Sequence, residues 1–262
     1  MKTFFETILV AFGMFSRVPV PQVEWNEKNR KYSMLAFPLV GLVLGLCWVI
    51  VASVCRHFGL PALLTGGLLT ALPVLVAGGI HLDGYADTCD ALASHASPGK
   101  MQEILRDPHC GAFAVIRLCT HFVGSFALCG ALSPDRTALF CLSLSFVLSR
   151  TLSGLAIVSL PSAKSSGLAH SFAAAADKRR VRTVLGVLAA VLCAALCLIG
   201  GVAGFAVVLT AGLCAALCAR TALHKFGGLS GDLAGWFLQK TELWMLAAVV
   251  LVQYAGPLLL RG

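Results

Sequence analysis

Three aspartates lie at helical spacing in the segment His81-Leu-Asp-Gly-Tyr-Ala-Asp-Thr-Cys-Asp90. At 100° per residue, Asp83, Asp87 and Asp90 share an arc of about 60° on one face of a helix. Carboxylates about 5–6 Å apart repel by roughly 3 kcal/mol at an effective dielectric of 20, so three of them need compensation. Oxygen ligands favour Mg²⁺ or Mn²⁺ over zinc, and Mg²⁺ typically also binds substrate phosphates. The spacing therefore predicts that these three residues are catalytic and hold Mg²⁺ beside a phosphorylated substrate.

Two neighbours of these aspartates are predicted to meet the substrate. Gly84 weakens the helix by about 1 kcal/mol relative to alanine, which makes sense where something approaches the backbone closely. His81 lies about 160° from the arc if the helix extends that far, so we expect it to support the site rather than to be a fourth ligand. The structural alternative for the whole segment is an acidic, solvated helix end.

A second segment, Arg106-Asp-Pro-His-Cys-Gly111, adds charged groups before an apolar run. Arg106 is a predicted phosphate contact, and His109 is the alternative in the same segment. Asp107 either adds a carboxylate at the substrate or caps a turn before Pro108. Arg150 lies within an apolar run, where a charge is costly and usually faces a cavity or partner, so it is a further predicted phosphate contact.

A glycine-rich segment, Gly227-Gly-Leu-Ser-Gly-Asp232, could bring backbone amides close to an anion. Gly228, Ser230 and Gly231 are therefore predicted to bind substrate, together with Lys225 just upstream. Asp232 would repel a phosphate unless it helps to hold a metal, so it is predicted to be a fourth Mg²⁺ ligand.

The elements that must position these residues are membrane spans. Of the 262 residues, 58% are apolar and only 12% are charged, and the mean hydropathy is +0.86. Soluble domains carry about 25% charged residues, so the composition excludes a soluble globule as well as a disordered chain. We expect an all-α, polytopic helical bundle forming a single membrane-embedded domain over residues 1–262. About 20 apolar residues cross a bilayer, and seven spans are predicted: 34–55, 60–80, 111–132, 137–160, 183–199, 202–219 and 243–260.

The N-terminal residues 1–16 form an apolar stretch that Glu6 interrupts, with no clear cleavage site after it. We expect an interfacial or re-entrant helix that is retained, rather than a signal peptide.

Charge sorts the loops into two sides. Segments 1–33, 81–110, 161–182 and 220–242 hold 15 of the 20 Lys and Arg residues, and the loops between them hold three. The positive-inside rule puts the first set, and with it the acidic motifs and the N-terminus, in the cytoplasm, and the C-terminus outside. The net charge of +8 is then a topology signal and not a sign of nucleic-acid binding.

Several motifs together resemble one known family. The string from Gly78 to Asp90 looks like the signature of the adenosylcobinamide-GDP ribazoletransferase (cobalamin synthase) family. Further segments resemble its other motifs in the same order: Phe15-Ser-Arg-Val-Pro-Val-Pro21, Arg106–Phe113, Gly167-Leu-Ala-His-Ser-Phe172 and Gly227–Asp232. The departures are small: Ala91 replaces a usual glycine, Ser230 replaces a usual threonine, and 108–110 differs from the usual string.

The resemblance implies a late step of vitamin B12 biosynthesis. GDP-activated adenosylcobinamide would react with α-ribazole or its 5′-phosphate, GMP would leave, and adenosylcobalamin or its phosphate would form. The family is membrane-bound and Mg²⁺-dependent. The implied partners are the two small substrates and the lipids of the inner membrane. Four points stay open. The protein could form a homo-oligomer or assemble with other cobalamin-biosynthesis enzymes. The number of metal ions and the choice of general base, Asp87 or Asp90, are also open.

Two alternatives share some of these features. A CDP-alcohol phosphotransferase also uses carboxylates and a divalent metal in a membrane, but its motif has an arginine where Asp87 follows Ala86, and its array is longer. A cation transporter would be expected to carry a second acidic cluster or an inverted repeat, and neither is visible in the sequence.

Overall fold

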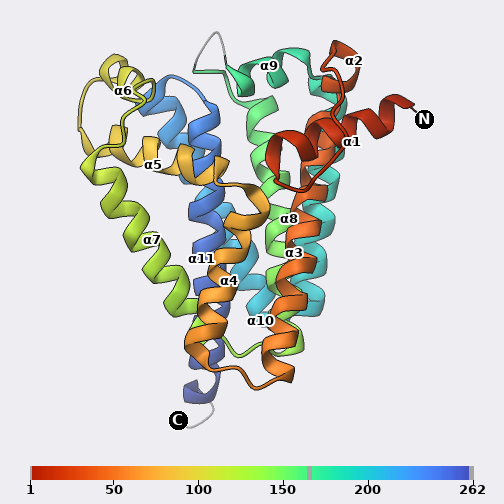
Figure 1. Ribbon diagram of the computed structural model, residues 1–262, viewed down its shortest axis with the longest axis vertical. Helices are drawn as coiled ribbons and strands as arrows, with labels where there is room; N and C mark the ends of the chain where they lie inside the picture. Colours follow the sequence, from red (N-terminus) through yellow and green to blue (C-terminus); the bar gives the residue numbers. More distant parts are fainter. Residues whose placement is uncertain (1, 164–166, 260–262) are drawn as a thin grey trace.

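The computed structural model of the protein describes residues 2–163 and 167–259, and these are helical almost throughout (Figure 1). Some predictions fall outside the described residues. These concern the side of the membrane on which each chain end lies, and residue 260 of the last expected span. Within the described residues the only strand-like pairing is one bridge between Ser162 and Leu229. In chain order the helices are α1 (Lys2–Phe15), α2 (Glu27–Arg30), α3 (Ser33–His57), α4 (Ala62–Ala77), α5 (Ile80–Ala93), α6 (Pro98–Ile104), α7 (Ala112–Ala131), α8 (Arg136–Ser159), α9 (Leu168–Ala175), α10 (Lys178–Phe226) and α11 (Gly231–Leu259).

Membrane-spanning length is reached by α3, α7, α8, α10 and α11, and by α4 and α5 taken together as a bent pair. The helix α10 has 49 residues, which at 1.5 Å per residue is about 74 Å, more than twice the bilayer core. Gly201 breaks it with φ 54° and ψ −133°. A Cβ on Gly204 would collide with the carbonyl oxygen of Leu196, so the second half folds back on the first. The expected spans 183–199 and 202–219 are thus confirmed as the two arms of a tight hairpin.

The bend between α4 and α5 turns the acidic helix out of the span. Gly78 and Gly79 have φ of 73° and 84°, a left-handed conformation that residues with a Cβ rarely adopt. The two helix axes consequently differ by 98°. The expected span 60–80 is therefore α4 alone, and α5 lies across one end of the bundle (Figure 1).

The loops that were predicted to share one side do lie together. Helices α1, α5, α6 and α9 gather at the upper end of the molecule, and the C-terminal end of α11 lies at the lower end (Figure 1). The helix α1 has 14 residues, about 21 Å, and is too short to cross a bilayer core of about 30 Å. The Arg17 amide after it donates a 2.7 Å hydrogen bond to the Val76 carbonyl, which ties this chain segment to the end of α4.

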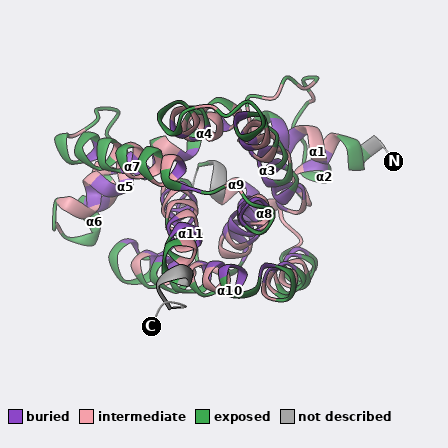
Figure 2. Cartoon of the chain, turned by 90° about the horizontal axis from the view of Figure 1, so that it is seen from below, coloured by how far each residue is buried: buried purple, intermediate pink, exposed green. Residues whose placement is uncertain are grey.

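The helix α8 lies at the centre, packed against α3, α10 and α11, and most of its residues are buried (Figure 2). Several of its polar side chains form hydrogen bonds within the bundle: the Ser145 hydroxyl, for example, donates to the Leu142 carbonyl at 2.7 Å. Arg150, 1% exposed, forms an ion pair with Glu242. The helix α11 begins at Gly231, well before the expected span at 243, so the assignment of Glu242 to a loop was wrong. The Glu242 side chain lowers the hydropathy of this segment, so the segment was assigned to a loop. Pairing with Arg150 offsets the cost of burying the Glu242 charge.

Candidate functional site

A cavity of about 240 Å³ opens where α1, α3, α5, α8, α9 and α11 meet. It brings together six of the residues that were predicted to form the site. These are His81, Asp83, Gly84, Ser230, Gly231 and Asp232. The two acidic motifs are more than 140 residues apart in the sequence, and one cavity joins them.

Two glycines let α5 and α11 touch through their backbones. A Cβ on Gly84 would lie 2.7 Å from the Cα of Asp232, and a Cβ on Gly235 would lie 2.8 Å from the carbonyl oxygen of His81. Both distances are far below ordinary van der Waals contact. A close approach at Gly84 is present, and the group that approaches is the backbone of Asp232; the predicted contact of Gly84 with substrate stays a prediction. This crossing places Asp83 and Asp232 on the same cavity.

Each of these two carboxylates lies in the first turn of its helix. The amide dipoles there favour a negative charge. Ser230, just before α11, accepts a hydrogen bond from the Leu233 amide at 3.2 Å and donates one to Asp232 Oδ2 at 3.3 Å. The hydroxyl therefore caps the helix and orients the carboxylate.

The donor set fits Mg²⁺. Asp83 is exposed to the cavity and Asp232 is partly exposed, and both offer oxygen atoms. Mg²⁺ is usually held by one or two carboxylates, with water and substrate phosphates completing its shell. Within residues 2–163 and 167–259, no group of three or more His, Cys, Asp or Glu side chains stands in position to bind a metal by itself. Two carboxylates from two helices match the smaller number that a phosphate-bound Mg²⁺ needs.

The other two predicted ligands lie further along α5. Asp87 and Asp90 are both half-buried, and neither is among the described residues that line the cavity. The Asp90 carboxylate accepts the Ala114 amide at 3.3 Å and lies against Gly111, where α7 begins. It thus provides the capping acceptor that Gly111, which has no side chain, lacks. Its role as a metal ligand stays a prediction.

The glycine-rich loop packs against another part of the chain. The Leu229 amide donates to the Pro161 carbonyl at 2.8 Å, and the Ala163 amide donates to the Leu229 carbonyl at 3.0 Å. A Cβ on Gly228 would lie 2.7 Å from the Ala163 nitrogen, so this glycine allows the close pairing of the two segments. Gly231 and Ser230 face the cavity, whereas Gly228 is buried in this pairing.

Three residues that were predicted to contact the substrate through their charges lie on the exposed surface instead. None of the three is among the described residues that line the cavity. Arg106 and Asp107 follow α6, and Lys225 is in the last turn of α10. Asp107 accepts two hydrogen bonds from His109, from its amide at 2.9 Å and from its ring Nδ1 at 2.7 Å. These bonds, the amide first, hold the pKa of Asp107 below its usual value. The geometry is that of a turn-capping aspartate; the substrate roles of all three residues stay predictions.

Arg150 has a partner inside the protein. Its guanidinium donates to Glu242 Oε1, to the Phe146 carbonyl at 3.0 Å and to the Ser149 hydroxyl at 3.2 Å. The predicted contact between Arg150 and a phosphate stays untested, and the observed ion pair gives the buried charge a structural explanation.

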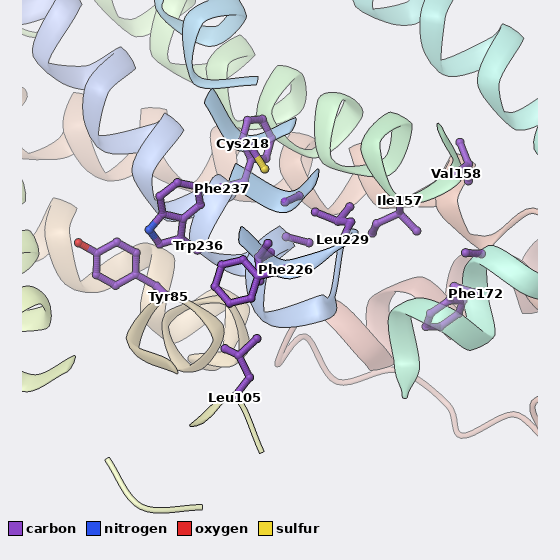
Figure 3. Packing of buried hydrophobic residues seen from close by; sticks show 14 of the residues in the cluster. Tyr85, Leu105, Ile157, Val158, Phe172, Cys218, Phe226, Leu229, Trp236 and Phe237 are labelled. Carbon is purple, nitrogen blue, oxygen red and sulfur yellow. The ribbon is translucent and has the colours of Figure 1, made fainter. Parts of the chain in front are cut away.

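Sequence reasoning missed the apolar half of the cavity. Phe15, Phe37 and Phe172 line it, as do Ser153 and Ile157 of α8. Figure 3 shows Phe172 on α9 and Ile157 on α8 within one cluster of buried side chains. Phe15 and Phe172 fall in motifs that carried the family resemblance, but a single phenylalanine in an apolar chain gives no signal of its own.

Comparison with known proteins assigns the chain to one family. Residues 7–250 match the family described as Cobalamin-5-phosphate synthase. The chain belongs to the cobalamin-5-phosphate synthase family. Relatives named adenosylcobinamide-GDP ribazoletransferase include one from Lachnoclostridium phytofermentans, 38% identical over 94% of both chains. Another, from Clostridium perfringens strain SM101, is 30% identical over 99% of both chains. No solved structure matches the chain.

Membership of the cobalamin-5-phosphate synthase family confirms the resemblance that rested on five short motifs. The match begins within α1 and ends within α11, so the cavity and both acidic motifs lie within the family's shared region.

Proposed function

We propose that this protein transfers the cobinamide phosphate of GDP-activated adenosylcobinamide to α-ribazole or its 5′-phosphate, releasing GMP. The observation that carries the proposal is the joint placement of Asp83 and Asp232 on one cavity, in a chain of the cobalamin-5-phosphate synthase family. Phosphoryl transfer needs little covalent chemistry from the protein. It depends on positioning the reactants and on stabilising charge, which opposed carboxylates around a metal can supply.

The reaction forms one bond and breaks another at the same phosphorus atom. A ribose hydroxyl of ribazole forms a bond to the phosphorus that carries cobinamide, and the bond from that phosphorus to the GMP oxygen breaks. The hydroxyl proton passes to one carboxylate of the acidic helix, either Asp87 or Asp90.

We propose that Asp83 and Asp232 hold Mg²⁺; Asp87 and Asp90 stay predicted ligands from the sequence, and neither lines the cavity that the first two share. Bound there, the cation would neutralise the diphosphate of the donor and the departing GMP. Ser230 holds the Asp232 carboxylate in place, and the contact between Gly84 and Asp232 fixes the spacing of the two helices.

We also propose that this protein lies in the inner membrane and that its site faces the cytoplasm. The basic loops and the acidic motifs lie at the same end of the bundle, which is the cytoplasmic end by the positive-inside rule (Figure 1). An alkaline phosphatase fused after residue 262 should be active, and one fused before α1 should be inactive.

The direct test uses the full chain in liposomes with GDP-cobinamide, α-ribazole and Mg²⁺. We expect cobalamin and GMP in equal amounts, and we expect both to disappear with EDTA or in Asp83→Asn. The matched control is Glu103→Gln, which removes an exposed carboxylate on α6 that pairs with Lys100 and should leave turnover unchanged.

Two results would overturn the proposal. Near-normal turnover of a folded Asp83→Asn protein would exclude the metal site. Release of CMP from a CDP-alcohol, with no GMP released from GDP-cobinamide, would show that the donor is wrong.

A further inference from the structure

The inner wall of the cavity is aromatic. Phe15 from α1, Phe37 from α3 and Phe172 from α9 all line it, although they come from three separate helices. The ring centroid of Phe15 lies 4.4 Å from that of Phe37 and 5.8 Å from that of Phe172. The His81 ring stacks near Phe15, with centroids 6.3 Å apart. Such a wall suits a flat, apolar ring system.

Two polar side chains on this wall lack partners. His81 is 6% exposed and Ser153 is 1% exposed, and both line the cavity. Among the described residues, neither His81 Nε2 nor the Ser153 hydroxyl makes a hydrogen bond. Buried polar atoms nearly always have partners, and leaving one unpaired is costly, so a ligand at this position explains both.

We propose that this part of the cavity binds the heteroaromatic base of the acceptor nucleoside, whose free ring nitrogen accepts a hydrogen bond from the Ser153 hydroxyl, while His81 Nε2 meets a hydroxyl of the attached ribose. The proposal rests on the function proposed above and names the place of one of its two substrates. Base binding beside Asp83 and Asp232 would bring the attached ribose to the carboxylates that line the same cavity.

The chemistry of the wall favours this base over guanine, the other flat ring in the reaction. Guanine carries donors and acceptors around most of its edge, and an apolar aromatic wall with two polar side chains would leave several of them unpaired. The dimethylbenzimidazole of α-ribazole has one free ring nitrogen and two methyl groups.

The test measures binding of α-ribazole alone to the purified full chain, before any transfer. We expect Ser153→Ala to weaken binding about three- to tenfold, as one lost hydrogen bond does. Phe172→Leu should also weaken it. In the transfer assay both variants should raise the KM for α-ribazole and leave the KM for GDP-cobinamide unchanged.

The matched control is Ser145→Ala, which removes a buried hydroxyl on the same helix that bonds to its own backbone and lies away from this cavity. It should bind α-ribazole as the unaltered protein does. Unchanged α-ribazole binding by folded Ser153→Ala and Phe172→Leu proteins would overturn the inference. Displacement of α-ribazole by GMP alone would instead assign this wall to guanine. Tight α-ribazole binding without any transfer would refute the proposed reaction and leave the base site standing.

Discussion

A methyl group at Gly84 should separate the two acidic motifs. The Cβ of alanine there would lie 2.7 Å from the Cα of Asp232 and 2.8 Å from its carbonyl oxygen. Carbon atoms in contact prefer about 3.5–4.0 Å, so α5 and α11 must move apart by about 1 Å. The atoms that clash are backbone atoms, and no side-chain rotation can relieve the contact.

A shift of about 1 Å in a catalytic constellation can lower a rate by roughly 100-fold. We therefore expect Gly84→Ala to lose most transfer activity while it still inserts and folds. The assay is GMP release in proteoliposomes, with the Tm in detergent measured on the same preparation.

The matched control is Gly186→Ala. Gly186 lies in α10 with no atom within 4 Å of a built Cβ, so alanine should keep full activity and add up to about 1 kcal/mol of helix stability. Full turnover by Gly84→Ala would refute the claim that the contact between α5 and α11 positions the site.

Three further predictions concern stability, each measured as Tm or as unfolding free energy in detergent. Glu242→Leu should cost about 3–5 kcal/mol because it strands the Arg150 charge, and Arg150→Met in the same chain should recover most of the loss; no recovery would contradict the pairing. Asp90→Ala should cost about 1 kcal/mol through the lost Ala114 bond, whereas Asp90→Asn keeps an acceptor and should cost less; equal losses would argue against a capping role. Gly201→Ala should cost about 1–3 kcal/mol because φ is 54° there, and an unchanged Tm would contradict the hairpin.

The sequence predicted the helices of this protein better than their ends. Long apolar runs specify membrane-spanning helices whatever their neighbours are. Five helices reach that length, α10 among them as a two-armed hairpin, and α4 reaches it only together with α5. The exceptions have local causes. The break at Gly78 and Gly79 needs left-handed backbone, which glycine permits but does not require. The helix α11 begins at Gly231, where the Ser230 hydroxyl caps it, and it carries Glu242 into the bundle because Arg150, 92 residues away, offsets the charge.

The site was predicted in part. Helical spacing placed three aspartates on one face of α5, but it could not say which neighbouring element each would meet. Asp83 meets the cavity shared with Asp232, whereas Asp90 meets the beginning of α7. The aromatic wall was missed because Phe15, Phe37 and Phe172 come together only through tertiary packing.

The pairing of Arg150 with Glu242 also bears on how the protein is made. The ribosome synthesises Arg150 before Glu242, and 92 residues separate them. At about 5–20 residues per second, several seconds pass in which the inserted arginine lacks its counter-charge. Placing an unpaired arginine at the centre of a membrane helix raises the free energy of insertion by about 3 kcal/mol. The helix α8 is therefore unfavourable in the lipid until α11 inserts beside it. Docking of α11 then neutralises this charge and brings Asp232 to Asp83 in one event, so a nascent chain completes the cavity that the two share only when its membrane core is complete.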